Sequence, residues 1–185
     1  MKKIVFILIA VTMLFTACNS NSPSSAKHDF RDIDFGMSTI ELSEIEGEPD
    51  NEITGDNLTT YYYSNKEVFG VKNAVIEYSI YENGVGGVCA KFQNEYADNK
   101  SYITEYNTVK KNLISAWGEP EKITEDEAEF NFQCSWDSGK KQLNLNKNST
   151  ENIMFRVEVY SSDYLEYTHN LLIKIQQERQ QSDTE

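Results

Sequence analysis

The chain has little of what most enzyme active sites require. Its 185 residues include two histidines and three cysteines, and these residues do not have the spacing of a zinc site. No serine or cysteine lies in the Gly-x-Ser-x-Gly pattern of a nucleophile elbow. Asp50, Glu52 and Thr54 have the spacing of the first ligands of a calcium loop, but Tyr61 stands where the bidentate glutamate is needed. We therefore expect no enzyme, no catalytic residue, no metal and no cofactor.

Positive charge is also scarce. The chain has 17 Lys and Arg against 30 Asp and Glu, a formal net charge of −13. A protein that binds nucleic acid neutralises phosphates with Lys and Arg, so this composition argues against a nucleic-acid partner. It argues equally against docking on anionic lipid by charge. Solubility is the simplest explanation of the acidity, and a basic partner is the alternative.

No apolar run is long enough to span a membrane comfortably. The longest covers residues 4–15, after Lys2 and Lys3, and small residues and Cys18 follow it. This order is typical of a secretory signal peptide, here residues 1–17. The stretch "LFTAC" resembles the lipobox of bacterial lipoproteins, and a plain secretory signal is the alternative. The resemblance implies lipidation of Cys18 and an extracytoplasmic protein anchored to the cell membrane by acyl chains such as palmitate.

A polar stretch separates this anchor from the folded part. Residues 18–29 contain almost no apolar side chain, so we expect a disordered tether. Without residues 1–17 the chain keeps 15 Lys and Arg and 30 Asp and Glu, which gives −15. We expect the fold to begin near Phe30.

Gly-Glu-Pro occurs twice, at Gly47 and at Gly118. Before the first copy, Ser38 and Glu41 have the spacing of a capping box, which predicts a helix over residues 39–46. Before the second copy, apolar residues recur at helical spacing up to Trp117. In both places glycine suits the end of a helix and proline prevents its continuation. The repeated motif therefore predicts two related units, residues 30–98 and 99–162.

Each unit continues with stretches in which apolar and polar residues alternate. Such alternation is typical of antiparallel strands with one buried face. The predicted fold class is α+β: two helix-plus-three-strand antiparallel repeats packed as one domain, with helices on one face of about six strands. Residues 163–185 add a C-terminal helix and tail, with an apolar stripe that packs on the domain or, alternatively, binds a partner. The stripe consists of Tyr164, Tyr167, Leu171 and Ile175.

The same alternation separates the two remaining cysteines. Cys134 is in phase with apolar neighbours, whereas Cys89 is out of phase with Val88 and Ala90. Residues that point to opposite sheet faces do not form a disulfide easily. We therefore expect two free thiols, with a disulfide as the alternative.

Tyrosine is in excess, with 11 residues, three of them consecutive at positions 61–63. Because neighbours in a strand point to opposite faces, some tyrosines must lie on the open face of the sheet. Ordinary strand propensity explains this excess, but tyrosine is also enriched in interfaces. If the protein has a binding surface, we expect it on that face. The candidate residues are Tyr62, Glu77, Lys91, Arg156, Glu158 and Tyr160.

The stretch "FGMSTIELSEIEGEPD" resembles the SmpA/OmlA (BamE-like) lipoproteins, and a tandem copy of such a unit resembles the fold of β-lactamase inhibitor protein. The likeness covers Phe35 to Phe92 and, more loosely, Tyr102 to Tyr160. It implies a bacterial envelope protein that binds or braces another envelope or secreted protein without catalysis. The alternative is a small-ligand or cell-wall-fragment binder with a pocket where the two halves meet. A hydrolase would need two opposed carboxylates in a cleft.

Overall fold

A computed structural model describes residues 28–55, 57–147 and 152–182. The expected signal peptide, Cys18 and most of the tether lie outside these residues. Near the start of the described part, the Phe30 side chain is completely buried.

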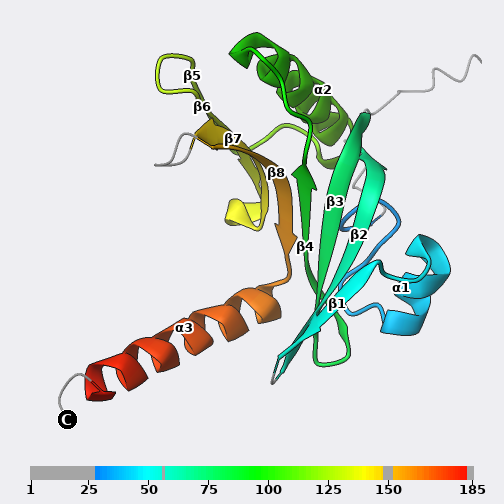
Figure 1. Ribbon diagram of the computed structural model, residues 1–185, viewed down its shortest axis with the longest axis vertical. Helices are drawn as coiled ribbons and strands as arrows, with labels where there is room; N and C mark the ends of the chain where they lie inside the picture. The colour runs from blue at the N-terminus through cyan, green and yellow to red at the C-terminus, as the bar shows by residue number, and fades with distance from the viewer. Residues whose placement is uncertain (1–27, 56, 148–151, 183–185) are drawn as a thin grey trace, which may run out of the picture.

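Eight antiparallel strands form one twisted sheet in the order β1-β2-β3-β4-β8-β7-β6-β5 (Figure 1). The order reads the same way inward from each edge, and the last strand, β8, pairs with β4 in the middle. The strands are β1 (Asn51–Thr54), β2 (Leu58–Val68), β3 (Val71–Tyr81), β4 (Gly84–Phe92), β5 (Lys122–Asp126), β6 (Asn131–Trp136), β7 (Lys141–Lys147) and β8 (Ile153–Tyr160).

The α+β class is confirmed, but the expectation of about six strands was wrong. The two additional strands are β1 and β5, which form the edges of the sheet. Every residue of β1 is exposed and β5 has a single half-buried residue. A strand with no buried face has no alternation to recognise. The turn between β3 and β4 is formed by Glu82 and Asn83, which have positive φ values, and Gly84 already belongs to β4.

Two helices cover one face of the sheet. The predicted helix over residues 39–46 is confirmed as α1 (Thr39–Glu46), and both hydrogen bonds of its Ser38–Glu41 capping box are present. Helix α2 (Asn99–Trp117) starts after its N-cap, Asp98. Gly47 and Gly118 end the two helices with nearly equal dihedral angles (φ 86°, ψ −167° and φ 84°, ψ −172°). In each case the glycine N–H donates to the carbonyl four residues earlier.

The core lies between these helices and the sheet. Alternate residues of the inner strands point into it, including Tyr78, Ala90, Cys134 and Val157, all completely buried. From α2 it receives Tyr102, Tyr106, Val109 and Leu113. The N-terminal segment, residues 28–37, also contributes, since Phe30 and Ile33 are buried.

The third helix, α3 (Ser162–Ser182), leaves the opposite face of the sheet and projects from the body (Figure 1). Tyr164 donates a hydrogen bond to Ser79 Oγ at 3.1 Å. Ser79 alternates with the buried Tyr78 and Ile80, so it belongs to the face that α1 and α2 do not cover. The helices of the two predicted units therefore share one face, and the C-terminal helix packs on the other. No helix within the described ranges is long and apolar enough to cross a bilayer.

Candidate functional site

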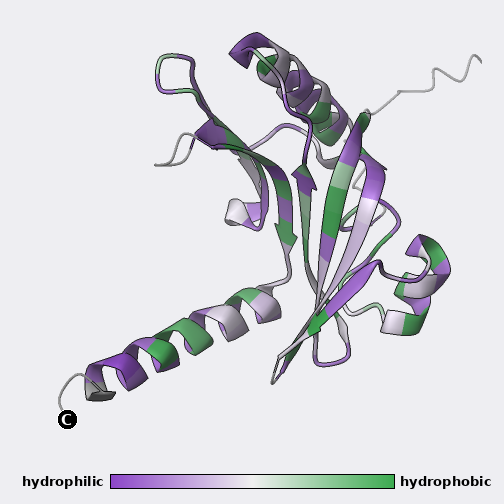
Figure 2. Ribbon diagram, viewed as in Figure 1, coloured by the Kyte–Doolittle hydropathy of each residue, from purple (hydrophilic) through white to green (hydrophobic). Residues whose placement is uncertain are grey.

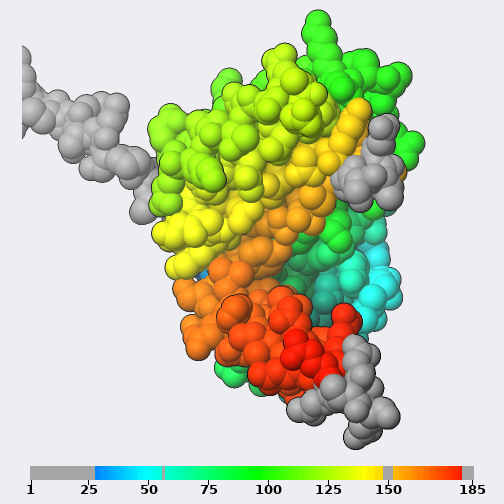
Figure 3. Space-filling view, turned by 90° about the vertical axis from the view of Figure 1, so that its left-hand side faces the viewer, coloured from blue at the N-terminus to red at the C-terminus, as the bar shows by residue number. Residues whose placement is uncertain are grey.

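All six candidate residues predicted from the sequence lie on the sheet face that α1 and α2 leave uncovered, here called the open face. The strand register places Tyr62 opposite Glu77, Glu77 opposite Cys89, and Cys89 opposite Glu158. Lys91 and Arg156 are paired in a neighbouring row, and Tyr160 is paired with Gly87. Side chains from four strands therefore form one surface, which Figure 3 shows with β8 in orange.

The charged groups of the open face are paired with one another. Lys91 Nζ lies 2.5 Å from Glu77 Oε1, and Arg156 Nε lies 2.9 Å from Glu158 Oε2. Glu158 also accepts hydrogen bonds from Tyr160 Oη at 2.8 Å and from Asn144 Nδ2 at 3.1 Å. Two acids and two bases give these four charged residues no net charge, in a chain that carries −13. These four residues therefore do not attract a strongly charged partner by their net charge.

Cys89 lies at the centre of this arrangement, and Cys134 lies in the core. Both are free thiols, as the opposite phases of their strands predict. Burial raises the pKa of Cys89 to about 12, and the carboxylates of Glu158 and Glu77 add to the effect. The thiol therefore stays protonated at neutral pH and does not have the properties of a reactive cysteine.

Helix α3 stands at the lower end of the open face in Figure 3. Tyr164 packs over two glycines of β4, where an added Cβ would lie 3.1 Å from the tyrosine at both Gly86 and Gly87. Its ring also stacks on Tyr160, with centroids 5.8 Å apart. The Gly-rich part of the β3–β4 hairpin thus seats a helix. These glycines are followed by the rest of β4 and not by the N-terminus of a helix, which is the arrangement that binds phosphate.

Beyond this contact, the predicted stripe of α3 runs off the body. Tyr164 is buried and Tyr167 stacks on Tyr81, with centroids 4.4 Å apart. Leu171 continues the stripe but is 38% exposed, and its neighbour Leu172 is 59% exposed. Figure 2 shows these hydrophobic patches along the projecting part of the helix. The expectation that the whole stripe packs on the domain therefore holds only for its first half.

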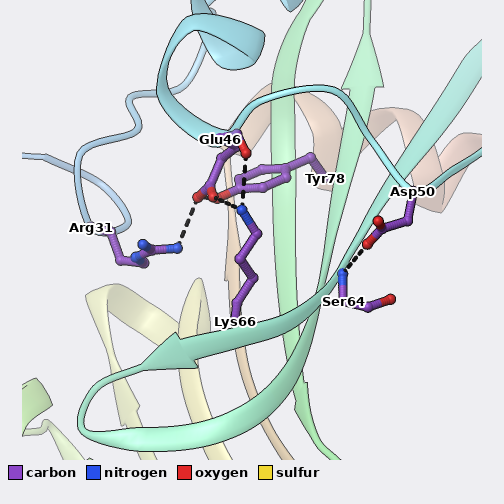
Figure 4. Close-up of polar contacts among 6 residues, drawn as sticks. All are labelled: Arg31, Glu46, Asp50, Ser64, Lys66 and Tyr78. Carbon is purple, nitrogen blue, oxygen red and sulfur yellow. Dashed lines mark hydrogen bonds and ion pairs between the residues drawn. The ribbon is translucent and has the colours of Figure 1, made fainter.

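A second polar cluster, which sequence reasoning missed, surrounds Glu46 at the end of α1 (Figure 4). The Glu46 side chain is 3% exposed and its carboxylate accepts from three donors. These are Arg31 Nη1 at 2.8 Å, Lys66 Nζ at 3.0 Å and Tyr78 Oη at 2.7 Å. Lys66 also donates to the Glu46 carbonyl at 2.9 Å. A glutamate in the last turn of a helix opposes the helix dipole, and this is the sequence feature that could have pointed to cationic partners.

The Glu46 cluster connects separate segments of the fold. Arg31 comes from the N-terminal segment, Lys66 from β2 and Tyr78 from β3, so one carboxylate joins α1 to three other segments. Burial and the charge of Glu46 raise the pKa of Tyr78, which keeps its hydroxyl protonated as a donor. Nearby, Asp50 Oδ2 accepts from the Ser64 N–H at 2.5 Å (Figure 4). The cluster has no second carboxylate opposed to Glu46.

Two neighbouring hollows flank the β3–β4 turn at the end of the sheet. The larger, about 540 Å³, lies between the β1–β2 hairpin, the turn and Tyr167 of α3. The smaller, about 310 Å³, lies between the turn, the N-terminal segment and the start of α3. The smaller hollow adjoins the end of the β4–β8 pairing, because Gly86 and Ser161 both line it and the Ser161 N–H donates to Gly86 O at 2.9 Å. The alternative of a pocket where the two halves meet therefore stays a prediction. Within the described ranges, no group of three or more His, Cys, Asp and Glu side chains could hold a metal ion.

No family model matches the chain, and no curated protein matches it. Among solved structures, the chain is similar to a DUF4309 family protein (YjgB) from Bacillus subtilis, with 11% identity and a TM-score of 0.36 over 72% of this chain and 81% of that one. It is also similar to a cysteine-rich secretory protein from Staphylococcus aureus, with 10% identity and a TM-score of 0.35 over 70% of this chain and 45% of that one. Both TM-scores are below 0.5, so neither likeness bears on function.

Proposed function

We propose that this chain is a lipid-anchored, extracytoplasmic module that binds another envelope or secreted protein through the open face and α3. The observation that carries the proposal is a sheet face that α1 and α2 leave uncovered. Helix α3 packs on one end of this face, and its apolar stripe continues past the body. Tyr62, Tyr160 and the paired charges give this face the polar and aromatic composition of protein interfaces. Leu171 and Leu172 add apolar groups of the kind that amphipathic helices place in a partner's groove.

The proposal includes an origin by duplication of one helix-and-strand unit, as in the tandem BamE-like arrangement. The palindromic strand order and the nearly equal dihedral angles of Gly47 and Gly118 support it. Two backbone bonds also correspond: Asp50 N–H donates to Tyr62 O, and Glu121 N–H donates to Ser135 O. In this arrangement each unit contributes four strands, and the open face spans both units.

A photo-crosslinking experiment in intact cells tests the binding face. A benzoylphenylalanine replaces Tyr62 on the open face or, as the control, Lys111 on the exposed side of α2. We expect one discrete adduct from position 62 and none of that mass from position 111. The same adduct from positions 62 and 111 would contradict the proposed face. So would the absence of an adduct both from position 62 and from a second probe at Tyr160.

The anchor is tested separately. Cys18→Ala should move the protein from the membrane fraction to the soluble fraction and abolish labelling with a palmitate analogue. If Cys18→Ala remains in the membrane fraction, the proposed lipid anchor is wrong, whatever the crosslinking shows.

A further inference from the structure

The larger hollow at the end of the sheet brings together three segments that are distant in the sequence. Thr54, Asn57 and Thr59 come from the β1–β2 hairpin, Glu82 and Asn83 from the β3–β4 turn, and Tyr167 from α3. Its volume of about 540 Å³ lies within the range of roughly 300–1,000 Å³ that is usual for small-molecule sites. None of the six candidate residues of the open face lines it, but it shares Tyr167 with α3, which is part of the proposed protein-binding surface.

The lining of this hollow excludes several ligand classes. No Lys, Arg or His is among its described lining residues, so these residues offer no countercharge to a phosphate, sulfate or carboxylate. Its aliphatic side chains are only Leu58 and Ile80, too few to bury a lipid chain or a drug-like apolar molecule. Both exclusions follow from the side chains themselves.

What remains in the lining is suited to hydroxyl groups. Asn57 and Asn83 each offer a donor and an acceptor, Thr54 and Thr59 offer hydroxyls, and the Glu82 carboxylate is an acceptor. A sugar hydroxyl donates one hydrogen bond and accepts others, so it can use all of these groups.

The aromatic side of the hollow suits the C–H face of a sugar ring. Tyr81 and Tyr167 stack on each other with an angle of 30° between their planes, and both line the hollow. Tyr81 Oη donates to Glu82 Oε1 at 2.9 Å, which fixes the carboxylate beside the rings. The two turn residues, Glu82 and Asn83, have φ values of 50° and 70°, and both line the hollow.

We propose that the hollow between Asn57, Asn83 and the Tyr81–Tyr167 pair binds a neutral saccharide of about two sugar units. The ligand hydroxyls pair with the amide, hydroxyl and carboxylate groups, and a sugar ring lies against the tyrosines. Because Tyr167 belongs to α3, the bound saccharide also contacts the helix that stands beside the open face.

The test uses the mature chain, residues 18–185, with Cys18→Ser so that it is not lipidated. Cellobiose and N,N′-diacetylchitobiose are titrated by heteronuclear NMR, with glucose 6-phosphate as the anionic comparison. We expect saturable shifts for at least one neutral disaccharide at residues of the hollow, and none for the phosphate ester. Tyr167→Ala should weaken binding about tenfold, as expected for the loss of one aromatic contact, and Tyr167→Phe should retain most of it.

Two further variants separate binding from folding. Asn83→Gly removes the amide but keeps a residue that tolerates positive φ, and it should weaken binding severalfold without changing the spectrum elsewhere. His169→Ala, on an exposed part of α3, should bind as the parent does. The proposal would be overturned by the absence of saturable shifts up to about 20 mM of either disaccharide. It would also be overturned if Tyr167→Ala and Asn83→Gly both bound the disaccharide as tightly as the parent, or if glucose 6-phosphate bound as tightly as the disaccharide. These outcomes leave the crosslinking test of the open face unaffected.

Discussion

Replacing Glu46 by glutamine tests how much of the fold depends on one buried carboxylate. The substitution keeps the size of the side chain and removes its charge. Arg31 and Lys66 then lose the negative charge that they share. An amide NH₂ in the place of Oε2 cannot accept from Lys66 Nζ, whereas the remaining oxygen in the place of Oε1 still accepts from Arg31 and Tyr78. Because both cations and Tyr78 belong to segments other than α1, the effect should appear as loss of global stability.

The expected magnitude follows from the exposure of the partners. Removing one member of a buried ion pair typically costs about 3–5 kcal/mol. Here the Arg31 and Lys66 side chains are 32% and 27% exposed, so water can partly replace the carboxylate. We therefore expect a loss of about 2 kcal/mol in the free energy of unfolding. For a domain of this size, that corresponds to a decrease of about 4–8 °C in Tm.

Urea and thermal unfolding of the unlipidated chain measure the loss, and Glu44→Gln on the same helix is the matched control. Glu44 is exposed, so its replacement should change stability by less than about 0.5 kcal/mol. In a double-mutant cycle, Arg31→Gln should destabilise the parent more than it destabilises the Glu46→Gln variant. A Glu46→Gln effect no larger than that of Glu44→Gln would show that the three donors do not stabilise the fold.

Two other predictions concern β4. Gly84→Ala should destabilise the protein by about 1–3 kcal/mol in urea unfolding, because the added Cβ would lie 2.9 Å from the Gly36 backbone. The control is Gly55→Ala, where the nearest atom to the added Cβ is 3.6 Å away. Equal losses of stability in the two variants would refute the close approach of Gly84 to Gly36. Alkylation of Cys89 by iodoacetamide at pH 8, followed by mass spectrometry, should be on the order of a thousandfold slower than in the unfolded chain, since its pKa is raised to about 12. Because the fold disfavours the thiolate, the contribution of Cys89 to stability is complete below pH 9 and is lost as pH rises from 9 to 12. Alkylation as fast as in the unfolded chain would contradict the burial of the Cys89 thiol.

Local interactions made part of the fold predictable. The capping box of Ser38 and Glu41 and the terminating Gly47 lie within ten positions of one another, so the limits of α1 could be read directly from the sequence. Alternation also assigned Tyr62, Cys89 and Glu158 to one face, because the period of a strand does not depend on its partners. These predictions needed no knowledge of which strands are neighbours.

The predictions that failed depend on contacts between distant segments. The edge strands β1 and β5 exist because β2 and β6 offer them hydrogen bonds, and their own side chains remain in solvent. Likewise, Glu46 is buried only because the N-terminal segment and β2 bring Arg31 and Lys66 to it. The direction of α3 is set by Gly86 and Gly87, which leave room for Tyr164, and no periodicity in the helix itself contains that information.

The central position of β8 has a consequence for how the protein is made. β4 pairs with β3 as soon as the first half of the chain is available, but its other edge waits for Arg156 to pair with Lys91 and for Tyr160 to pair with Gly87. Until the last strand has been synthesised, the first four strands present an edge of unpaired backbone N–H and C=O groups, which can pair with strands of other chains. A chain truncated before β8 should therefore aggregate.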